Sequence, residues 1–294
     1  MRHKEAISGY LFIMPWLVGL VVFTAVPIIG SLAYSFTKYD LLSPPRFVGL
    51  YNYQRVFMED PRFWVSLRVT GLYLLGMVPS QLILGFVLAI LLNQSIKGIA
   101  LFRTLYYLPA VLPAMASYML WMWILHDHYG LLNYFLSMFG IPGQSWLIDS
   151  RWVIPAIIIL GLWGGTGAVM IIFLARLQGI PTALYEAARL DGANWLRTFW
   201  HITIPAMSPI ILFNLIMQIV TSFQVFGSAY VITQGGPGDA SLFYVLYLYR
   251  NAFQFNKMGY ASALSWLLFI MIMLATIFVL KSSKKWVYYE AEVK

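Results

Sequence analysis

The sequence predicts an all-α membrane protein with six transmembrane helices in a single domain, residues 1–294. Its composition is the first reason, because 61% of the residues are hydrophobic and only 10% are charged, whereas soluble domains carry about 25% charged residues. The second is a set of apolar stretches that contain no Asp, Glu, Lys, Arg or His. Each is long enough to cross the roughly 30 Å hydrocarbon layer as a helix, which satisfies its own backbone hydrogen bonds. They cover about residues 8–36, 69–92, 105–125, 152–175, 202–226 and 261–280.

The first stretch, 8–36, far exceeds the apolar core of about 7–15 residues in a secretion signal, so we expect it to stay as a membrane helix. Lys and Arg are denser in the two tails and in loops 93–104 and 176–201 than in the opposite loops. The positive-inside rule then predicts a multi-pass protein of the cell membrane with both termini in the cytoplasm. The net charge of +8 is scattered, so we expect contact with lipid headgroups and no nucleic acid.

Two loop features between the stretches call for interpretation. The apolar run Leu242–Tyr249 ends at Arg250 and is too short to cross, so it predicts an outer interfacial helix. His126 and His128 flank Asp127, yet two histidines without a third nearby ligand favour a solvated loop, and we expect no metal site.

What the sequence lacks narrows the function. With no Asp, Glu, Lys, Arg or His in the six stretches, an ion-coupled secondary transporter of a small polar solute is disfavoured, although it is kept as the alternative. A phosphate-binding G-x-x-x-x-G-K-[ST] loop is missing, so the chain is not expected to hydrolyse ATP by that route. No Ser–His or paired-Asp set lies within the stretches, and no catalytic residue of a membrane-embedded enzyme is predicted. The chain also has no cysteine, which excludes disulfides and thiolate sites.

The loop between the fourth and fifth stretches carries the clearest local pattern. Thr182 is a candidate helix cap, Ala183–Leu190 favours a helix of about two turns, and Gly192 suits a left-handed exit. The small and apolar side chains of this helix could enter a groove on a partner, and Glu186 could accept hydrogen bonds there. Spacing alone equally allows a helix that only covers the membrane surface.

This loop resembles a known family. The loop contains Glu186-Ala187-Ala188 and, after two more residues, Asp191-Gly192-Ala193, followed by Phe199, Ile202, Pro205 and Pro209. This series is similar to the EAA loop of permease subunits in binding-protein-dependent ABC importers. Motifs elsewhere resemble the carbohydrate-uptake branch, in particular the maltose F-type and glycerol-phosphate A-type subunits. These motifs include Leu11–Trp16, Phe47–Leu50 with Asn52-Tyr53, Phe102-Arg103, Gly130–Asn133, Leu177–Pro181 and Thr233–Pro237.

The resemblance implies the type I permease fold of ABC importers and a set of partners. These are a second permease in a heterodimer, two ATP-binding subunits that carry ATP and magnesium, an extracytoplasmic solute-binding protein and a carbohydrate substrate. This chain would itself bind no cofactor and catalyse no reaction. Its coupling element within loop 176–201 would be Glu186, Ala187, Ala188, Asp191, Gly192 and Ala193.

Polar side chains in the fifth stretch suggest where a solute would pass. Asn214, Gln218, Thr221 and Ser222 share one helix face. They could bond to a partner helix, or bond sugar hydroxyls while Phe223 offers a flat ring to the sugar. By the resemblance, Gln218 and Ser222 stand at positions similar to sugar contacts. Gly165 and Ala168 do so in the fourth stretch, where close helix packing is the favoured interpretation of the glycines.

Overall fold

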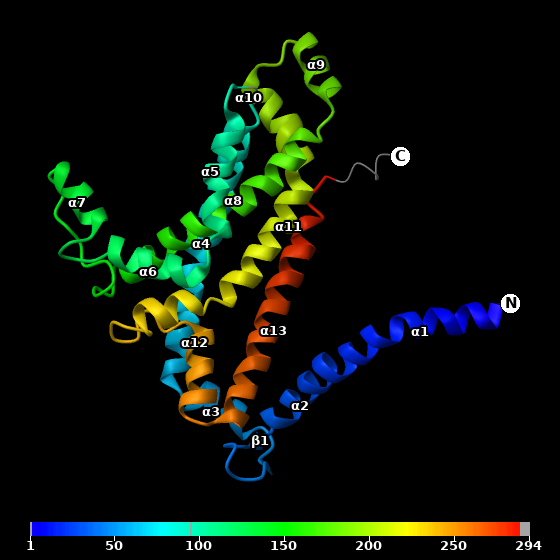
Figure 1. Cartoon of the computed structure of the whole chain (residues 1–294), viewed down its shortest axis with the longest axis vertical. Coiled ribbons are helices and arrows are strands. Elements are labelled where there is room, and N and C mark those ends of the chain that lie inside the picture. The colour runs from blue at the N-terminus through cyan, green and yellow to red at the C-terminus, as the bar shows by residue number, and fades with distance from the viewer. Residues whose placement is uncertain (1, 95, 289–294) are drawn as a thin grey trace. The chain divides into compact units, whose positions relative to one another are not determined.

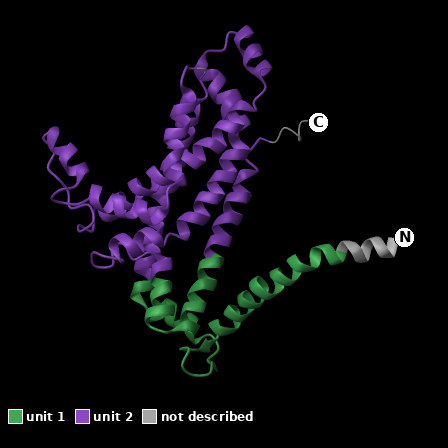
Figure 2. Ribbon diagram, viewed as in Figure 1, with its two compact units in different colours: residues 1–63, 247–270 green, residues 64–246, 271–294 purple. Residues whose placement is uncertain are grey.

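The computed structural model describes residues 2–94 and 96–288, with side chains from residue 10 onward. The chain divides into two compact units, one of residues 1–63 and 247–270 and the other of residues 64–246 and 271–294 (Figure 2). These units are groups of mutual contacts and do not define separate domains, so the single domain expected from the sequence stays a prediction. The tails predicted to be cytoplasmic include residues 1 and 289–294, which lie outside the described residues.

The first unit combines the N-terminal helices with the turn that follows α12. Pro61 begins α4 in this unit, and Met258 begins α13. Its elements are α1 (Arg2–Leu20), a π turn η1 (Val21–Ala25), α2 (Val26–Ser35), β1 (Thr37–Lys38), β2 (Arg46–Phe47), α3 (Tyr51–Met58) and η4 (Arg250–Gln254). The two strands pair antiparallel, with Thr37 opposite Phe47. The apolar window of the candidate span Tyr10–Ser35 has no residue buried inside the chain, so that window can contact lipid or another protein.

Asn52 connects the end of α2 to α3. Its side-chain amide is buried and donates to the carbonyls of Ser35 at 2.8 Å and Thr37 at 2.9 Å. Tyr53 donates its hydroxyl to Ser35 Oγ at 2.8 Å. The Asn-Tyr pair of the sequence therefore holds the turn after the first span in place.

Asp60 organises the start of α4. Its Oδ1 accepts the backbone N–H of Arg62 at 3.0 Å and of Phe63 at 3.3 Å, which satisfies first-turn donors of the helix. Its Oδ2 accepts the hydroxyls of Tyr247 and Tyr260. One carboxylate thus joins three segments that are distant in the sequence.

The second unit holds most of the long helices (Figure 2). Its elements are most of α4 (Pro61–Leu92), α5 (Ile99–Val111), α6 (Ala114–Ile124), α7 (Leu131–Met138), α8 (Val153–Gln178), α9 (Thr182–Leu190), α10 (Trp195–Thr198), η2 (Phe199–Thr203), α11 (Ile204–Phe223), η3 (Ala229–Thr233), the start of α12 (Tyr244–Tyr249) and the end of α13 (Met258–Ser283). Helix α8 is central, because Val169, Met170 and Phe173 pack with Ala89 of α4 and Met207 of α11.

Within residues 2–94 and 96–288, five helices are long and apolar enough to cross a membrane. They are Tyr10–Ser35, which joins α1, η1 and α2, then Pro61–Leu92, Val153–Gln178, Trp195–Phe223 and Met258–Ser283. The third predicted stretch, 105–125, differs from the straight helix that we expected. It is split between α5 and α6, which meet at 98° and make a sixth span only if counted together. Leu112 is extended because it precedes a proline, and Pro113 has no N–H with which to continue α5.

The run Leu242–Tyr249 contains the short helix α12, and its first residues are buried inside the chain. A position of this run at the membrane interface stays a prediction. Leu242, Phe243 and Tyr244 are each at most 1% exposed. The backbone N–H of Tyr244 donates to Thr70 Oγ1 at 2.9 Å, and Phe243 packs edge-on against Tyr73 at 5.2 Å. An eight-residue apolar run looks the same whether it packs on lipid or on a neighbouring helix.

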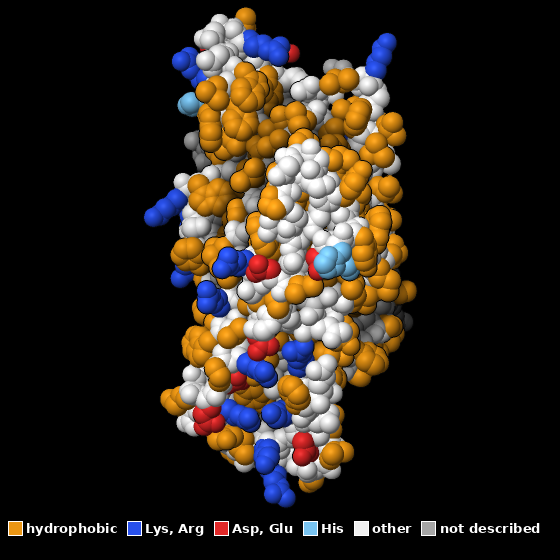
Figure 3. Space-filling model, turned by 90° about the vertical axis from the view of Figure 1, so that its left-hand side faces the viewer, with side chains coloured by type: hydrophobic (Ala, Val, Ile, Leu, Met, Phe, Trp, Pro, Cys, Tyr) orange, Lys and Arg blue, Asp and Glu red, His pale blue; other side chains and the backbone are white. Residues whose placement is uncertain are grey.

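The surface of the molecule is strongly apolar. Large side chains such as Phe12, Phe23 and Leu75 are 70% exposed or more, and hydrophobic side chains cover much of the face in Figure 3. A soluble protein rarely exposes so much contiguous apolar surface. This surface is the one expected of helices that face lipid or partner helices.

Candidate functional site

The loop with the clearest sequence pattern folds as a short, exposed helix. Helix α9 covers Thr182–Leu190 and has no buried residue. Thr182 is its first residue and not its cap as we expected, because Pro181 occupies the cap position and no side chain caps the helix. The left-handed exit is confirmed: Gly192 has φ +73°, and the N–H of Ala193 bonds to the carbonyl of Ala188 at 2.9 Å.

Few contacts hold α9, but they lead directly to the membrane helices. Tyr185 Oη lies 3.2 Å from Thr203 Oγ1, just before α11. Arg176, near the end of α8, donates from Nε to the carbonyl of Ala206 in α11 at 3.0 Å. Asn194 caps α10 by accepting the N–H of Arg197 at 2.9 Å. In Figure 1, α9 stands beyond the ends of α8 and α11. Helix α9 is therefore connected in sequence to the end of α8 and by Tyr185 to the segment that begins α11.

The pattern residues lie on two sides of this helix. Glu186 and Ala187 are exposed. Ala188, Asp191 and Ala193 line a cavity of about 360 Å³ together with Arg197 and His201 of the following segment. The loop thus offers both an exposed carboxylate and a recess with polar walls.

The predicted polar stripe of α11 is only partly open. Asn214 is 1% exposed and donates its amide to the carbonyl of Ile210 in its own helix at 3.0 Å. Ser222 is 3% exposed, Gln218 and Phe223 are half-buried, and Thr221 is exposed. The stripe therefore runs from the interior of the chain to its surface, and its contact with a solute stays a prediction.

The glycine-rich part of α8 shows two different environments. A Cβ added to Gly165 would lie 2.4 Å from Gln81 Nε2 of α4, whereas one added to Gly164 would meet nothing within 4 Å. Ala168 is exposed. Gly165 therefore allows a neighbouring side chain to approach, and the Gly164 and Ala168 positions face outward.

Gln81 was missed by the sequence reasoning. It is 3% exposed, and its Oε1 has no hydrogen-bond partner among the described residues. The sequence did contain a feature that could have pointed to Gln81, since it is the sole Gln in the stretch 69–92. A buried amide with a free acceptor in a membrane helix marks a polar position that another group can use.

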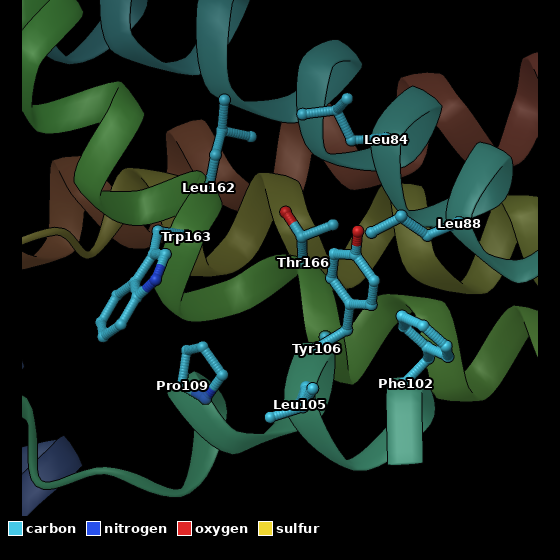
Figure 4. Close-up of a pocket in the computed structure, with 10 residues that line it drawn as sticks. Leu84, Leu88, Phe102, Leu105, Tyr106, Pro109, Leu162, Trp163 and Thr166 are labelled. Atoms are coloured by element: carbon cyan, nitrogen blue, oxygen red, sulfur yellow. The ribbon is translucent and has the colours of Figure 1, made fainter. Parts of the chain in front are cut away.

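Two further cavities of the second unit lie among its long helices. The larger, of about 610 Å³, is lined by apolar side chains of α4, α5 and α8 around Thr166, whose Oγ1 bonds to no described residue (Figure 4). The smaller, of about 290 Å³, is lined by Tyr73, Tyr118, Gly161, Gln224, Gly227 and Ser228 among others; we call it the tyrosine pocket. Neither tyrosine was singled out by the sequence, because three helices must pack before these residues meet.

The two histidines of the loop after α6 pair with the aspartate between them. His126 Nδ1 lies 3.1 Å from Asp127 Oδ1, and His128 Nε2 lies 3.5 Å from Asp127 Oδ2. Tyr129 stacks on the His126 ring at 3.5 Å. The carboxylate thus faces two imidazoles in a local turn.

Comparisons with known proteins agree on one kind of membrane component. The family described as binding-protein-dependent transport system inner membrane component matches residues 81–288. A probable ABC transporter permease of Bacillus subtilis, YesP, is 40% identical and the match covers 99% of this chain and 94% of that one. The trehalose/maltose transport system permease MalF of Thermococcus litoralis is 35% identical, over 96% of this chain and 95% of its own.

Solved structures give the same fold. A chain in the crystal structure of a bacterial ABC transporter that imports the acidic polysaccharide alginate superposes with a TM-score of 0.83 at 21% identity, covering 97% of this chain and 99% of that chain. A second structure, of the alginate transporter with an alginate-bound periplasmic protein, gives a TM-score of 0.81 at 23% identity and covers 96% of both chains. At these identities the likeness concerns the fold.

Proposed function

The chain belongs to the family of inner membrane components of binding-protein-dependent transport systems, and on that premise we propose that it is a permease subunit of an ATP-driven carbohydrate importer. Curated relatives support the substrate class, since they include permeases named for trehalose and maltose, for lactose and for arabinooligosaccharides. In this proposal the chain forms half of the solute path, and a second permease forms the other half. A solute-binding protein outside the cell delivers the sugar.

In this proposal, the movement that ATP drives in the partner subunits reaches this chain through α9. The helix has no buried residue, Tyr185 contacts Thr203 just before α11, and Arg176 joins the end of α8 to α11. We propose that each of two ATP-binding subunits receives one such helix in a groove, and that Glu186 accepts a hydrogen bond there. ATP and magnesium bind to those subunits, and this chain carries no catalytic residue. Closure of the ATPases would move the two permeases between inward and outward states as rigid bodies.

Both termini lie in the cytoplasm in this arrangement, on the same side as α9. The polar positions Gln218, Ser222 and Asn214, with Phe223, Gly165 and Ala168, would line the solute path in at least one of the two states. Asn214 and Ser222, which are buried here, would become accessible only when α11 moves against its neighbours.

A single substitution tests the coupling role. Glu186→Ala should weaken retention of the ATP-binding subunit about tenfold or more, because a hydrogen bond to a charged group contributes about 1.5–3 kcal/mol. Sugar-stimulated ATP hydrolysis of the assembled transporter should fall with it. Glu59→Ala is the matched control, since Glu59 is also an exposed glutamate but lies after α3. Normal ATPase retention and normal sugar-stimulated hydrolysis in the Glu186 variant would reject the role.

A further inference from the structure

The tyrosine pocket presents two phenol groups whose hydroxyls have no hydrogen-bond partner among the residues that the structure describes. Tyr73 is 5% exposed, and its ring is fixed by the edge-on contact with Phe243. The Tyr118 ring packs with the cluster around Trp121 and Leu160. Neither hydroxyl bonds to a described residue. Tyrosine hydroxyls in a largely apolar wall usually find a hydrogen-bond partner, and these two hydroxyls are open to a ligand or water in the pocket.

Two glycines make the room into which these hydroxyls point. A Cβ added to Gly161 of α8 would lie 2.9 Å from Tyr73 Oη, and one added to Gly227 would lie 2.8 Å from Tyr118 Oη. Any larger residue at either position would push the tip of a ring aside. The space in front of both hydroxyls thus depends on residues from separate segments of the chain.

The remaining walls suit a sugar. Ile157, Leu160 and Phe226 supply apolar surface, while Gln224 and Ser228 supply an amide and a hydroxyl. A pyranose has the same mixture, with hydroxyls around its edge and C–H groups on its faces. None of the lining residues carries a charge, and an anion placed there would lose its hydration without gaining an ionic partner. The lining therefore favours a neutral sugar over a phosphate or a carboxylate.

The position of the pocket continues the proposed solute path outward. Gln224 lies six residues beyond Gln218, which is about 9 Å along a helix axis. Gly161 lies one turn before Gly165 in α8, on the end of that helix that begins at Val153. Both helices thus place the pocket on the side of the predicted stripe away from α9. A solute that enters from outside would meet the pocket before it reaches Gln218.

We propose that the tyrosine pocket is an outer subsite of the solute path, where the hydroxyls of Tyr73 and Tyr118 hold one neutral sugar ring. The volume of about 290 Å³ stands at the lower limit of ligand pockets, so it accepts one ring and not a whole oligosaccharide. This inference rests on the proposed function, because it names the solute and the residues that select it.

The test measures sugar binding to the solubilised transporter without its binding protein. Maltose, trehalose and lactose are the neutral probes, and glucuronate and glycerol 3-phosphate are the anionic ones. Each is titrated while the unfolding temperature is followed, because a ligand that binds only the native state raises it. At least one neutral probe should bind the wild type, and neither anion should. Tyr73→Phe and Tyr118→Phe each keep the ring and should weaken that binding about threefold to tenfold, as for one lost neutral hydrogen bond.

Tyr106→Phe is the control, since Tyr106 lines the larger apolar cavity and its loss of a hydroxyl should leave sugar binding unchanged. Equal affinities in wild type and both pocket variants would overturn the inference, as would binding of an anionic probe at least as tight as that of the neutral ones, or no binding of any neutral probe. Failure of the proposed function has a different signature. It would appear as no ATP-dependent uptake of any of these sugars by the wild-type transporter reconstituted with its binding protein.

Discussion

Gly167 lies inside the long helix α8, where one added methyl group should disturb the packing of the second unit. A Cβ there would lie 2.3 Å from the carbonyl oxygen of Tyr106 and 2.9 Å from Cα of Tyr107. Both atoms belong to the backbone of α5, so no side-chain rotation relieves the clash. Non-bonded atoms pack at about 3.5–4.0 Å, and α5 would have to move by about 1 Å.

The change in the free energy of unfolding has two opposing contributions. Overpacking of a tight contact costs about 1–3 kcal/mol, while alanine gains about 1 kcal/mol over glycine inside a helix. Gly167→Ala should therefore lower the free energy of unfolding by up to about 2 kcal/mol. Gly164→Ala is the matched control, because its Cβ meets nothing within 4 Å. That variant keeps only the favourable term and should be slightly more stable than the wild type.

Thermal unfolding of both variants in one detergent measures the difference. About 1–3 kcal/mol separates them by the terms above, and each kcal/mol shifts the midpoint of a large domain by about 2–4 °C. Gly167→Ala should thus unfold at least about 2 °C below Gly164→Ala. Equal midpoints for the two variants would refute the packing argument, because both substitutions change helix propensity alike.

Two further predictions concern polar groups outside the long helices. Asn133→Ala should lower the free energy of unfolding by about 1–3 kcal/mol. The reason is that the Asn133 amide donates to the carbonyls of Asp127 and Gln144, and its oxygen accepts the Trp146 indole N–H at 2.7 Å. Faster hydrogen exchange in α7 would reveal the loss, and unchanged exchange would contradict it. Burial and the hydrogen bond to Asp60 raise the pKa of Tyr247 to about 12. The unfolded chain therefore loses this proton first, and stability should fall between about pH 10 and 12. Tyr247→Phe should flatten that part of the pH profile, and an unchanged profile would count against it.

Local sequence signals predicted the helices but not the contacts between them. Apolar length and missing charges were enough to predict the spans around residues 69–92, 152–175, 202–226 and 261–280, and Gly192 indicated the end of α9. Pro113 was visible, yet a proline inside a membrane helix is often tolerated, so the 98° bend could not be read from it. Roles assigned to Gln218 and Ser222 stay predictions. The tyrosine pocket depends on packing among three helices, which no periodicity along one stretch can indicate.

The bend between α5 and α6 has a consequence for what surrounds this chain. The N–H groups of Ala114, Met115 and Ala116 begin a helix that no side chain caps, and every residue from Ala110 to Ala116 is exposed. Such donors are stable at membrane depth only beside water or another polypeptide. Hydrocarbon tails cannot solvate this corner, so wherever it lies at membrane depth, water or another polypeptide has to cover it.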